Sequence, residues 1–271
     1  MLLAIDIGNT TIGFAVIEGD CPLHLKGTVP FNIVSVAVID TDAKPNKIKA
    51  VTAKILRSQT ISRAIICSVV PKASKTLENI LKKTVPVGII GRDIVVPVKN
   101  RYKNPKQVGQ DRLVGAYGAM KIYGCPLIVV DLGTAITFDV ISAKGEYLGG
   151  AIVPGIRLSA ESLFLKTALL PKIDIQAPRH IIGKTTQESM LSGLFYGYGS
   201  LCKGMIDLMS SKVSISVKVI MTGGHTHLMK KFVSPKIRKN SYRHSRESGN
   251  PKNIIIDEDL VFKGIYFLSR S

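Results

Sequence analysis

The chain of 271 residues contains no tryptophan, and aromatic residues make up only 6% of it. Proteins that bind single-stranded nucleic acid stack bases on aromatic rings, so this composition disfavours a dedicated single-strand binder. No apolar run approaches the ~18 residues that a membrane span needs. The apolar start lacks a basic leader and is interrupted by Asp6, so we expect no signal peptide and a cytoplasmic location.

Cysteine is also scarce. The four cysteines lie far apart and form no Cys-x-x-Cys pair: Cys21, Cys67, Cys125 and Cys202. This spacing suggests neither a zinc site nor a disulfide framework. We therefore interpret the cysteines as reduced packing residues.

Acidic residues are few, 19 against 37 basic ones, which gives a net charge of +18. Such a charge is compatible with binding nucleic acid, a membrane surface or a small anionic substrate. Segment 235–253 holds six Lys or Arg and one Glu. We interpret it as a solvated surface loop, inserted at 236–252, and regard a nucleic-acid-binding tail as the less favoured alternative.

An internal repeat is the most informative feature that the chain does contain. Residues 3–17, LAIDIGNTTIGFAVI, align with residues 128–141, IVVDLGTAITFDVI, with a one-residue gap. Each copy has an apolar strand, an Asp-x-Gly turn and a second strand, and a third strand is expected at 24–29 or 146–152. The copies begin about half a chain apart, so each has room for its own sheet and helices, which indicates a duplicated domain.

Alternating helix and strand patterns follow each copy and predict two α/β lobes with mixed sheets and a cleft between them. We place the lobes at 1–118 and 119–271. The predicted helices are 46–57, 72–83, 105–123, 156–166, 187–209, 225–232 and 259–269. The further predicted strands are 63–70, 89–98 and 213–221.

The two Asp-x-Gly turns have the chemistry of a polyphosphate clamp. Glycine lets backbone N–H groups approach an anion closely, and Asn and Thr side chains add donors. Asp6 and Asp131 would then lie near phosphates, where a carboxylate needs a cation beside it, and magnesium meets that need. Two ordinary hairpin turns are the alternative. A strand follows each glycine, which argues against the dinucleotide-binding and Walker A loops, both of which need a helix there.

Two further clusters are candidates for chemistry. Asp111, within Gly109-Gln110-Asp111-Arg112, is either a helix cap or, in a cleft, a general base beside an arginine that holds an anionic substrate. Residues 222–224, Thr-Gly-Gly, end a predicted strand and form either an adenine pocket or a plain turn. The nearby His-x-His at 225–227 has no further ligand, and we treat both histidines as surface residues.

The combination resembles one known family, the type III pantothenate kinases, within the superfamily of acetate and sugar kinases, heat-shock ATPases and actin. The matching strings are DIGNTTIG at 6–13, SVVP at 68–71, GQDRLVGAYGA at 109–119, VDLGTAITFDV at 130–140, GEYLGGAIVPGI at 145–156, IGKTTQESMLSGLFYGY at 182–198 and TGG at 222–224. The resemblance implies a duplicated ribonuclease H-like, actin-like ATPase fold. It also implies that ATP phosphorylates the primary hydroxyl of pantothenate, the first step of coenzyme A synthesis.

The resemblance also implies roles for individual residues. Asp111 would be the general base, Asp6 would hold magnesium, and Asp131 would hold potassium or ammonium. Thr186 would reach pantothenate from a partner subunit, which implies a homodimer with shared sites. ATP would bind at Asp6, Ile7, Gly8, Asn9, Thr10, Thr11, Ile12, Gly13 and Thr134. Pantothenate would bind at Tyr102, Gly109, Gln110, Asp111, Arg112 and Thr186.

The chain departs from the family pattern in three places. It lacks the Trp-Arg motif after the third strand, it has Thr185 where Asn is usual, and its basic segment is long. None of these departures affects the phosphate residues. Two rival functions remain: a kinase for another hydroxylated substrate, and a non-catalytic transcription accessory protein on the same fold. The three retained aspartates argue against the second rival.

Overall fold

A computed structural model describes residues 1–19, 31–213, 217–233 and 254–270 of the chain. The chain divides into two compact units. Unit 1 comprises Met1–Gly124 together with Asp259–Ser271, and unit 2 comprises Cys125–Glu258. The boundary predicted after residue 118 falls inside a helix of unit 1, and the C-terminal helix belongs to unit 1 rather than to the second lobe.

Unit 1 contains a five-stranded sheet in the order β3-β2-β1-β4-β5, in which β2 is antiparallel to its neighbours and the other pairs are parallel. The strands are β1 Leu2–Ile7, β2 Thr11–Gly19, β3 Phe31–Asp40, β4 Arg63–Ser68 and β5 Val87–Ile89. The helices are α1 Pro45–Ser58, α2 Pro71–Leu81, α3 Gln110–Tyr123 and α8 Leu260–Ser269. A short strand, β6 Lys99–Asn100, and a 3₁₀ turn, Pro105–Gln107, precede α3.

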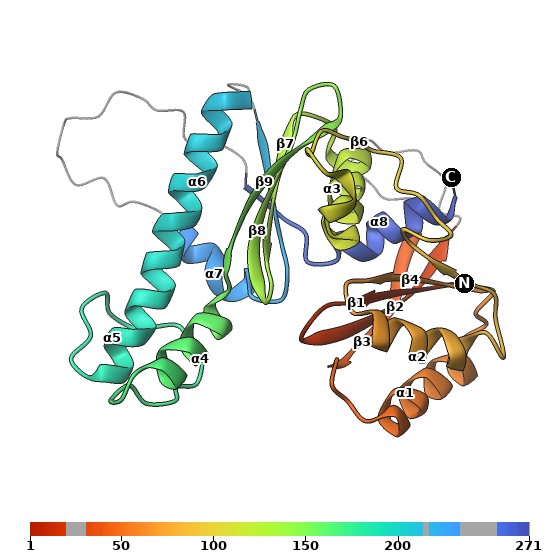
Figure 1. Cartoon of the computed structure of the whole chain (residues 1–271), viewed down its shortest axis with the longest axis horizontal. Helices are drawn as coiled ribbons and strands as arrows, with labels where there is room; N and C mark the ends of the chain where they lie inside the picture. Colours follow the sequence, from red (N-terminus) through yellow and green to blue (C-terminus); the bar gives the residue numbers. More distant parts are fainter. Residues whose placement is uncertain (20–30, 214–216, 234–253, 271) are drawn as a thin grey trace. The chain divides into compact units, whose positions relative to one another are not determined.

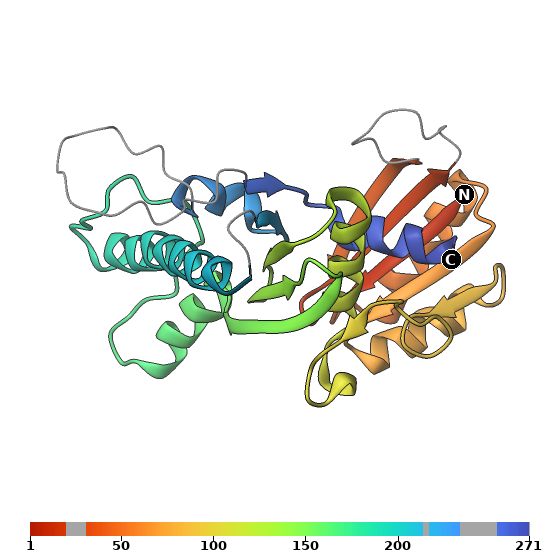
Figure 2. The ribbon, with the colours of Figure 1, turned by 90° about the horizontal axis from the view of Figure 1, so that it is seen from above.

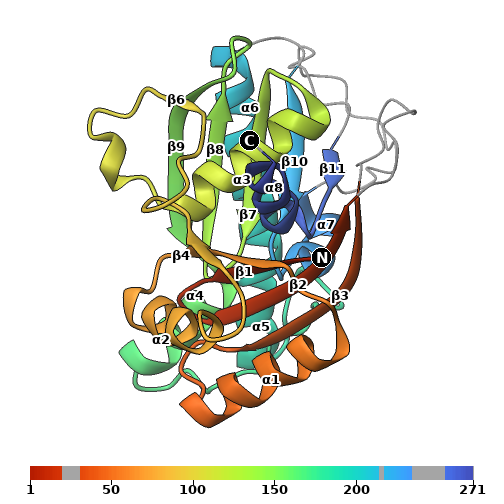
Figure 3. The same ribbon diagram turned by 90° about the vertical axis from the view of Figure 1, so that its right-hand side faces the viewer.

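Helices cover both faces of the first sheet. Leu3, Ile5 and Ile7 of β1 pack into a core with side chains of α1 and α2. The opposite face is covered by α3 and α8, which pack against each other and against β4 and β1. Figures 2 and 3 show α8 beside the strands, on the side away from α1 and α2. Because strand side chains alternate between faces, the even-numbered residues of β1 point toward α3 and α8.

Unit 2 contains a second sheet, with its own strands in the order β11-β10-β7-β8-β9. Its strands are β7 Leu127–Leu132, β8 Ala135–Ile141, β9 Glu146–Pro154, β10 Lys218–Thr222 and β11 Ile254–Ile256. Its helices are α4 Ile156–Lys166, α5 Thr186–Ser192, α6 Tyr198–Val213 and α7 Thr226–Val233, drawn in Figure 1. Side chains of α6 and α7 pack on β7 and β8 in one buried core.

The predicted duplication is confirmed down to its irregularities. In both units the second strand is antiparallel to the first and third, and the fourth is parallel to the first. The register shifts between Val16 and Ile17 in β2, and between Val140 and Ile141 in β8. These pairs occupy the same place in the aligned repeat. Each unit therefore has the ribonuclease H-like topology that the resemblance implies.

Most predicted elements are confirmed, with differences where glycine or proline interrupts a pattern. The helix predicted at 187–209 is divided by a turn of π-helix at Gly193–Gly197, and the one at 105–123 by an extended link before Gly109. The strand predicted at 89–98 is confined to β5 and a single bridge, Ile90 to Ile94. The strand expected at 24–29 and the basic segment 235–253 lie outside the described residues. Among the described residues, none of the helices has the length and apolar character needed to cross a bilayer.

Candidate functional site

The first Asp-x-Gly turn is held rigidly by backbone bonds. The Gly8 N–H donates to the Thr11 carbonyl across 2.9 Å, which closes the turn between β1 and β2. Thr41, directly after β3, donates its hydroxyl to the Gly8 carbonyl at 2.7 Å and its N–H to the Thr10 carbonyl at 2.9 Å. Asn9 and Thr10 are exposed. Both residues therefore lie on the exposed part of a turn that backbone hydrogen bonds hold in place.

The second turn has the same construction. The Gly133 N–H donates to the Ala135 carbonyl at 3.1 Å, and Gly155, directly after β9, donates its N–H to the Thr134 carbonyl at 3.0 Å. Gly155 thus corresponds to Thr41 of unit 1. Both turns present backbone N–H groups and small polar side chains, which suits an anion.

Asp6 and Asp111 lie near one buried sulfur atom in unit 1. Asp6 is an even-numbered residue of β1, so it points to the face covered by α3, and it pairs with Cys67 of β4. Cys67 is fully buried. Burial, and then the negative charges of Asp6 and Asp111, raise the pKa of the Cys67 thiol. The two carboxylates that the sequence analysis assigns to magnesium and to proton transfer therefore lie on the same face of the sheet.

Asp111 occupies the first turn of α3, two residues after the N-cap residue Gly109. Its carboxylate accepts a hydrogen bond from the Arg112 N–H at 2.8 Å and lies beside Gly109, near the Val69 side chain. Burial raises the pKa of the Asp111 carboxyl, although the Arg112 N–H and the Arg112 charge oppose this rise. A largely desolvated carboxylate with a raised pKa is a stronger proton acceptor than an exposed one.

Asp131 is the matching carboxylate of unit 2. It is half-buried at the end of β7, and its Oδ1 lies in the space that a side chain at position 223 would fill. Gly223 has φ +93°, and the next residue but one, His225, donates its N–H to the Leu132 carbonyl at 3.0 Å. Burial lowers the pKa of His225; its bond to Leu132 opposes this, and the charge of Arg157 adds to it. The backbone of the Thr-Gly-Gly turn therefore lies directly against the Asp131 carboxylate.

The remaining predicted residues lie on separate elements. Thr186 is the exposed first residue of α5, which Thr185 caps by accepting the Glu188 N–H at 3.2 Å. Threonine and asparagine are both effective N-caps, so Thr185 performs the capping role open to the asparagine usual in the family. Tyr102 lies between β6 and the 3₁₀ turn, with its N–H bonded to Asn100 Oδ1 at 2.9 Å.

Sequence reasoning missed Thr41 and Gly155, the residues that hold the two turns. Their common signal is position: each directly follows the third strand of its repeat. The third strand described in unit 1 begins at Phe31, whereas the sequence analysis expected a strand at 24–29, so the equivalence of these two residues did not emerge from the alignment.

The carboxylates fit a magnesium ion that is held mainly by a nucleotide. Among the described residues, no three His, Cys, Asp or Glu side chains gather closely enough to hold a metal alone. Magnesium bound with ATP needs only one or two carboxylates, because phosphate oxygens and water complete its octahedron. Asp6, at the end of β1 beside the turn, suits that role.

Comparisons with known proteins agree on one family. A family model described as type III pantothenate kinase matches residues 2–208. A type III pantothenate kinase of Persephonella marina is 43% identical over 235 residues, covering 85% of this chain and 90% of the relative. One from a Sulfurihydrogenibium species is 37% identical over 272 residues, covering 100% of both chains. The solved ethanolamine utilization protein EutJ from Carboxydothermus hydrogenoformans shares the fold, with a TM-score of 0.53 at 12% identity over 98% of this chain and 89% of that one.

The Gly223 turn yields a stability prediction. Gly223→Ala should destabilise unit 2 by about 2–5 kcal/mol, because a Cβ would collide with the Asp131 carboxylate and the positive φ would strain an alanine. Thermal unfolding measures this loss. Gly224→Ala is the matched control, since a Cβ there meets nothing within 4 Å. Equal melting temperatures for the two variants would contradict the prediction.

Proposed function

Because the chain belongs to the type III pantothenate kinase family, we propose that it transfers the γ-phosphate of ATP to the primary hydroxyl of pantothenate, with Asp111 as the general base. The observation that carries this assignment is geometric: Asp6 pairs with Cys67 on the sheet face that α3 covers, and Asp111 lies in the first turn of α3. The expected cytoplasmic location stays a prediction.

The two matched turns would bind the ATP phosphates. Residues 6–13 would supply backbone N–H groups and the Asn9 and Thr10 side chains, and Thr134 would contribute from unit 2. The bonds from Thr41 and Gly155 support this role, because they hold each turn before a ligand arrives. A preorganised anion site loses little conformational entropy on binding. Asp6 would hold the magnesium ion, which neutralises phosphate charge.

Asp111 would orient the pantothenate hydroxyl and accept its proton as the oxygen attacks the γ-phosphorus. Phosphoryl transfer requires mainly positioning and charge neutralisation, so a base on the first turn of a packed helix suits it. Arg112 would bind the pantothenate carboxylate, with Tyr102, Gly109 and Gln110 around the rest of the substrate. The Arg112 charge also keeps Asp111 ionised over a wider pH range.

Removal of the base tests this assignment. Asp111→Asn should lower kcat by about 10² to 10⁴-fold and leave ATP binding nearly intact, because an amide still fills the site but accepts no proton. A coupled assay of ADP release, with and without pantothenate, measures turnover. Asp174→Asn, a change at an exposed aspartate of unit 2, is the control. Wild-type turnover in Asp111→Asn would disprove the role of Asp111.

The same assay gives a pH test. A general base acts only when deprotonated, and burial raises the pKa of Asp111. An unperturbed aspartate has a pKa of about 4. The acid limb of the kcat/KM profile should therefore lie at a higher pH than this value.

We assign Asp131 to a monovalent cation, potassium or ammonium. Its half-buried carboxylate, backed by the Gly223 turn, supports this role. Asp131→Asn should lower the affinity for activating potassium by at least about 10-fold, because ligand-shell changes typically cost 10- to 100-fold. Turnover is measured against potassium at constant ionic strength, with tetramethylammonium as the replacement cation. A potassium response equal to that of the wild type would exclude Asp131.

We further propose a homodimer in which Thr186 contacts pantothenate in the partner's site. Exposed large apolar side chains on α4 and the segment that leads to α5 support it: Leu158, Phe164, Leu165, Leu169, Ile181 and Ile182. Apolar side chains concentrated in this way are typical of a protein interface. Thr186 directly follows this segment, so an interface here would carry it toward a second copy.

Charge placed in this surface should separate the dimer. Leu165→Glu should weaken dimerisation by about 10²-fold or more, because it removes ~1.5–3 kcal/mol of apolar burial from each copy and a twofold interface contains the change twice. Sedimentation equilibrium measures the dissociation constant, and pantothenate-dependent kcat/KM should fall with dimer content. Val95→Glu changes a more exposed apolar residue of unit 1, 81% accessible against 65% for Leu165, and should leave the assembly intact. A monomeric wild type would refute the dimer.

A further inference from the structure

A tight turn after β5 joins the sheet of unit 1 to the start of α3. The Gly91 N–H donates to the Ile94 carbonyl at 2.8 Å, and the Asp93 N–H donates to the Ile89 carbonyl at 2.8 Å. The Ile90 N–H donates to the Ile66 carbonyl of β4 at 2.9 Å. The turn Ile89–Ile94 is thus closed on itself and attached to the strand that carries Cys67.

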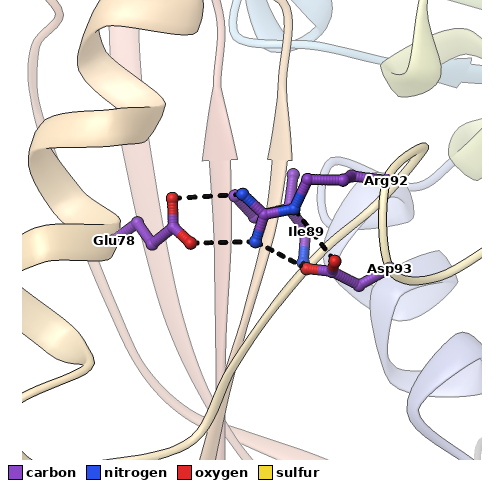
Figure 4. Close-up of polar contacts among 4 residues, drawn as sticks. All are labelled: Glu78, Ile89, Arg92 and Asp93. Atoms are coloured by element: carbon purple, nitrogen blue, oxygen red, sulfur yellow. Dashed lines mark hydrogen bonds and ion pairs between the residues drawn. The ribbon is translucent and has the colours of Figure 1, made fainter.

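An ion network holds this turn to α2. Arg92 donates two hydrogen bonds to Glu78 of α2, at 2.8 and 3.2 Å, and two to Asp93, at 2.8 and 2.9 Å (Figure 4). Asp93 Oδ2 also accepts the Ile89 N–H at 2.9 Å. Hydrogen bonds from Arg92 lower the pKa of both Glu78 and Asp93, so both stay charged at neutral pH.

The geometry of the network matters more here than its contribution to stability. The Arg92 side chain is 54% exposed, and a single exposed ion pair contributes little to stability. Bidentate bonds on two sides of one guanidinium nevertheless restrict its orientation strongly. The turn is therefore fixed in direction relative to α2 and the sheet.

Gly91 is the point at which the turn meets α3. Its φ is +87°, and a Cβ built on it would lie 2.9 Å from Gln110 Cδ and 3.1 Å from Gln110 Cγ. The backbone of Gly91 therefore lies directly against the Gln110 side chain. Gln110 is the first residue of α3 and immediately precedes Asp111. The turn thus supports the helix start that carries the carboxylate.

We propose that the Ile89–Ile94 turn positions Asp111 for proton transfer, with Gly91 and Arg92 as positioning residues that touch neither substrate. Gly91 limits where Gln110 lies, and Arg92 holds Gly91 in place from α2. The inference rests on the proposed role of Asp111 as the base. It matters for rate because a misplacement of 1 Å can cost about 10²-fold in turnover.

The first test is Gly91→Ala, in which the new methyl group pushes Gln110 and the first turn of α3. We expect kcat to fall about 10- to 100-fold with an unchanged KM for ATP, since the phosphate turns are untouched. The acid limb of the kcat/KM profile should move to lower pH, because a displaced Asp111 is less buried. Gly145→Ala, at φ +73° in a turn of unit 2, adds comparable backbone strain and should leave kcat and the pH profile unchanged.

The second test avoids any steric clash and applies even if Gly91→Ala fails to fold. Arg92→Ala releases the turn from α2. It should lower kcat and shift the acid limb to lower pH, each by less than Gly91→Ala does. Arg92→Lys, which keeps the charge but loses the bidentate bonds, should recover only part of the kcat that Arg92→Ala loses. Arg57→Ala, at an exposed arginine of α1, is the control.

The outcomes separate this inference from the proposed function. If the wild type is active and Asp111→Asn is inactive, but folded Gly91→Ala and Arg92→Ala keep the wild-type kcat and acid limb, the positioning role alone is wrong. If the variants only melt earlier, with normal kcat and pH profile, the turn is purely structural and the inference is also overturned. If wild-type turnover does not depend on pantothenate, or Asp111→Asn is fully active, the proposed function fails and the inference fails with it.

Discussion

The alternation of side chains along β1 and β7 is the constraint on which the site depends. Each strand lies between two hydrogen-bonded neighbours, and all but one of its residues are nearly inaccessible to water. In each strand the one partly exposed residue is the aspartate at the penultimate position, Asp6 in β1 and Asp131 in β7. A carboxylate is too costly to desolvate in the middle of such a strand. At the end of the strand, where the side chain is partly exposed beside a turn, a carboxylate is tolerated.

Because the domain is duplicated, the same construction of the glycine turn occurs in both units. Both units close the glycine turn with a backbone bond, hold it from the residue after the third strand, and shift register at the same place in the second strand. A bulge increases local twist and redirects a strand, so its repetition preserves the shape of each turn. The difference between the units lies in what surrounds the carboxylate. Asp6 shares its face with Cys67 and Asp111, whereas Asp131 is backed by the bare backbone of Gly223.

The carboxylate that we propose as the base lies on a helix that the repeat does not include. Asp111 lies on α3, which follows the fifth strand of unit 1 and packs with α8 from the other end of the chain. Its carboxylate lies beside Gly109 and accepts the Arg112 N–H, and the preceding residue, Gln110, contacts Gly91 of the Ile89–Ile94 turn. The turns proposed to bind phosphate are built from local sequence, while the proposed base is held by contacts between distant segments.

Much of this protein was determined by sequence alone. The repeated Asp-x-Gly pattern predicted two equivalent turns and a duplicated domain, because alternation of apolar residues and turn glycines is a local property. The family and the ribonuclease H-like topology followed from the resemblance of seven strings along the chain. The assignment of α8 to unit 1, the splitting of the helix at 187–209, and the turn-holding roles of Thr41 and Gly155 were decided only by the tertiary structure. These features arise from contacts between residues far apart in the chain or from backbone geometry that several side chains satisfy. Asp111 shows both levels: its residue type marks it as a base or a cap, and only burial among distant elements gives it a raised pKa.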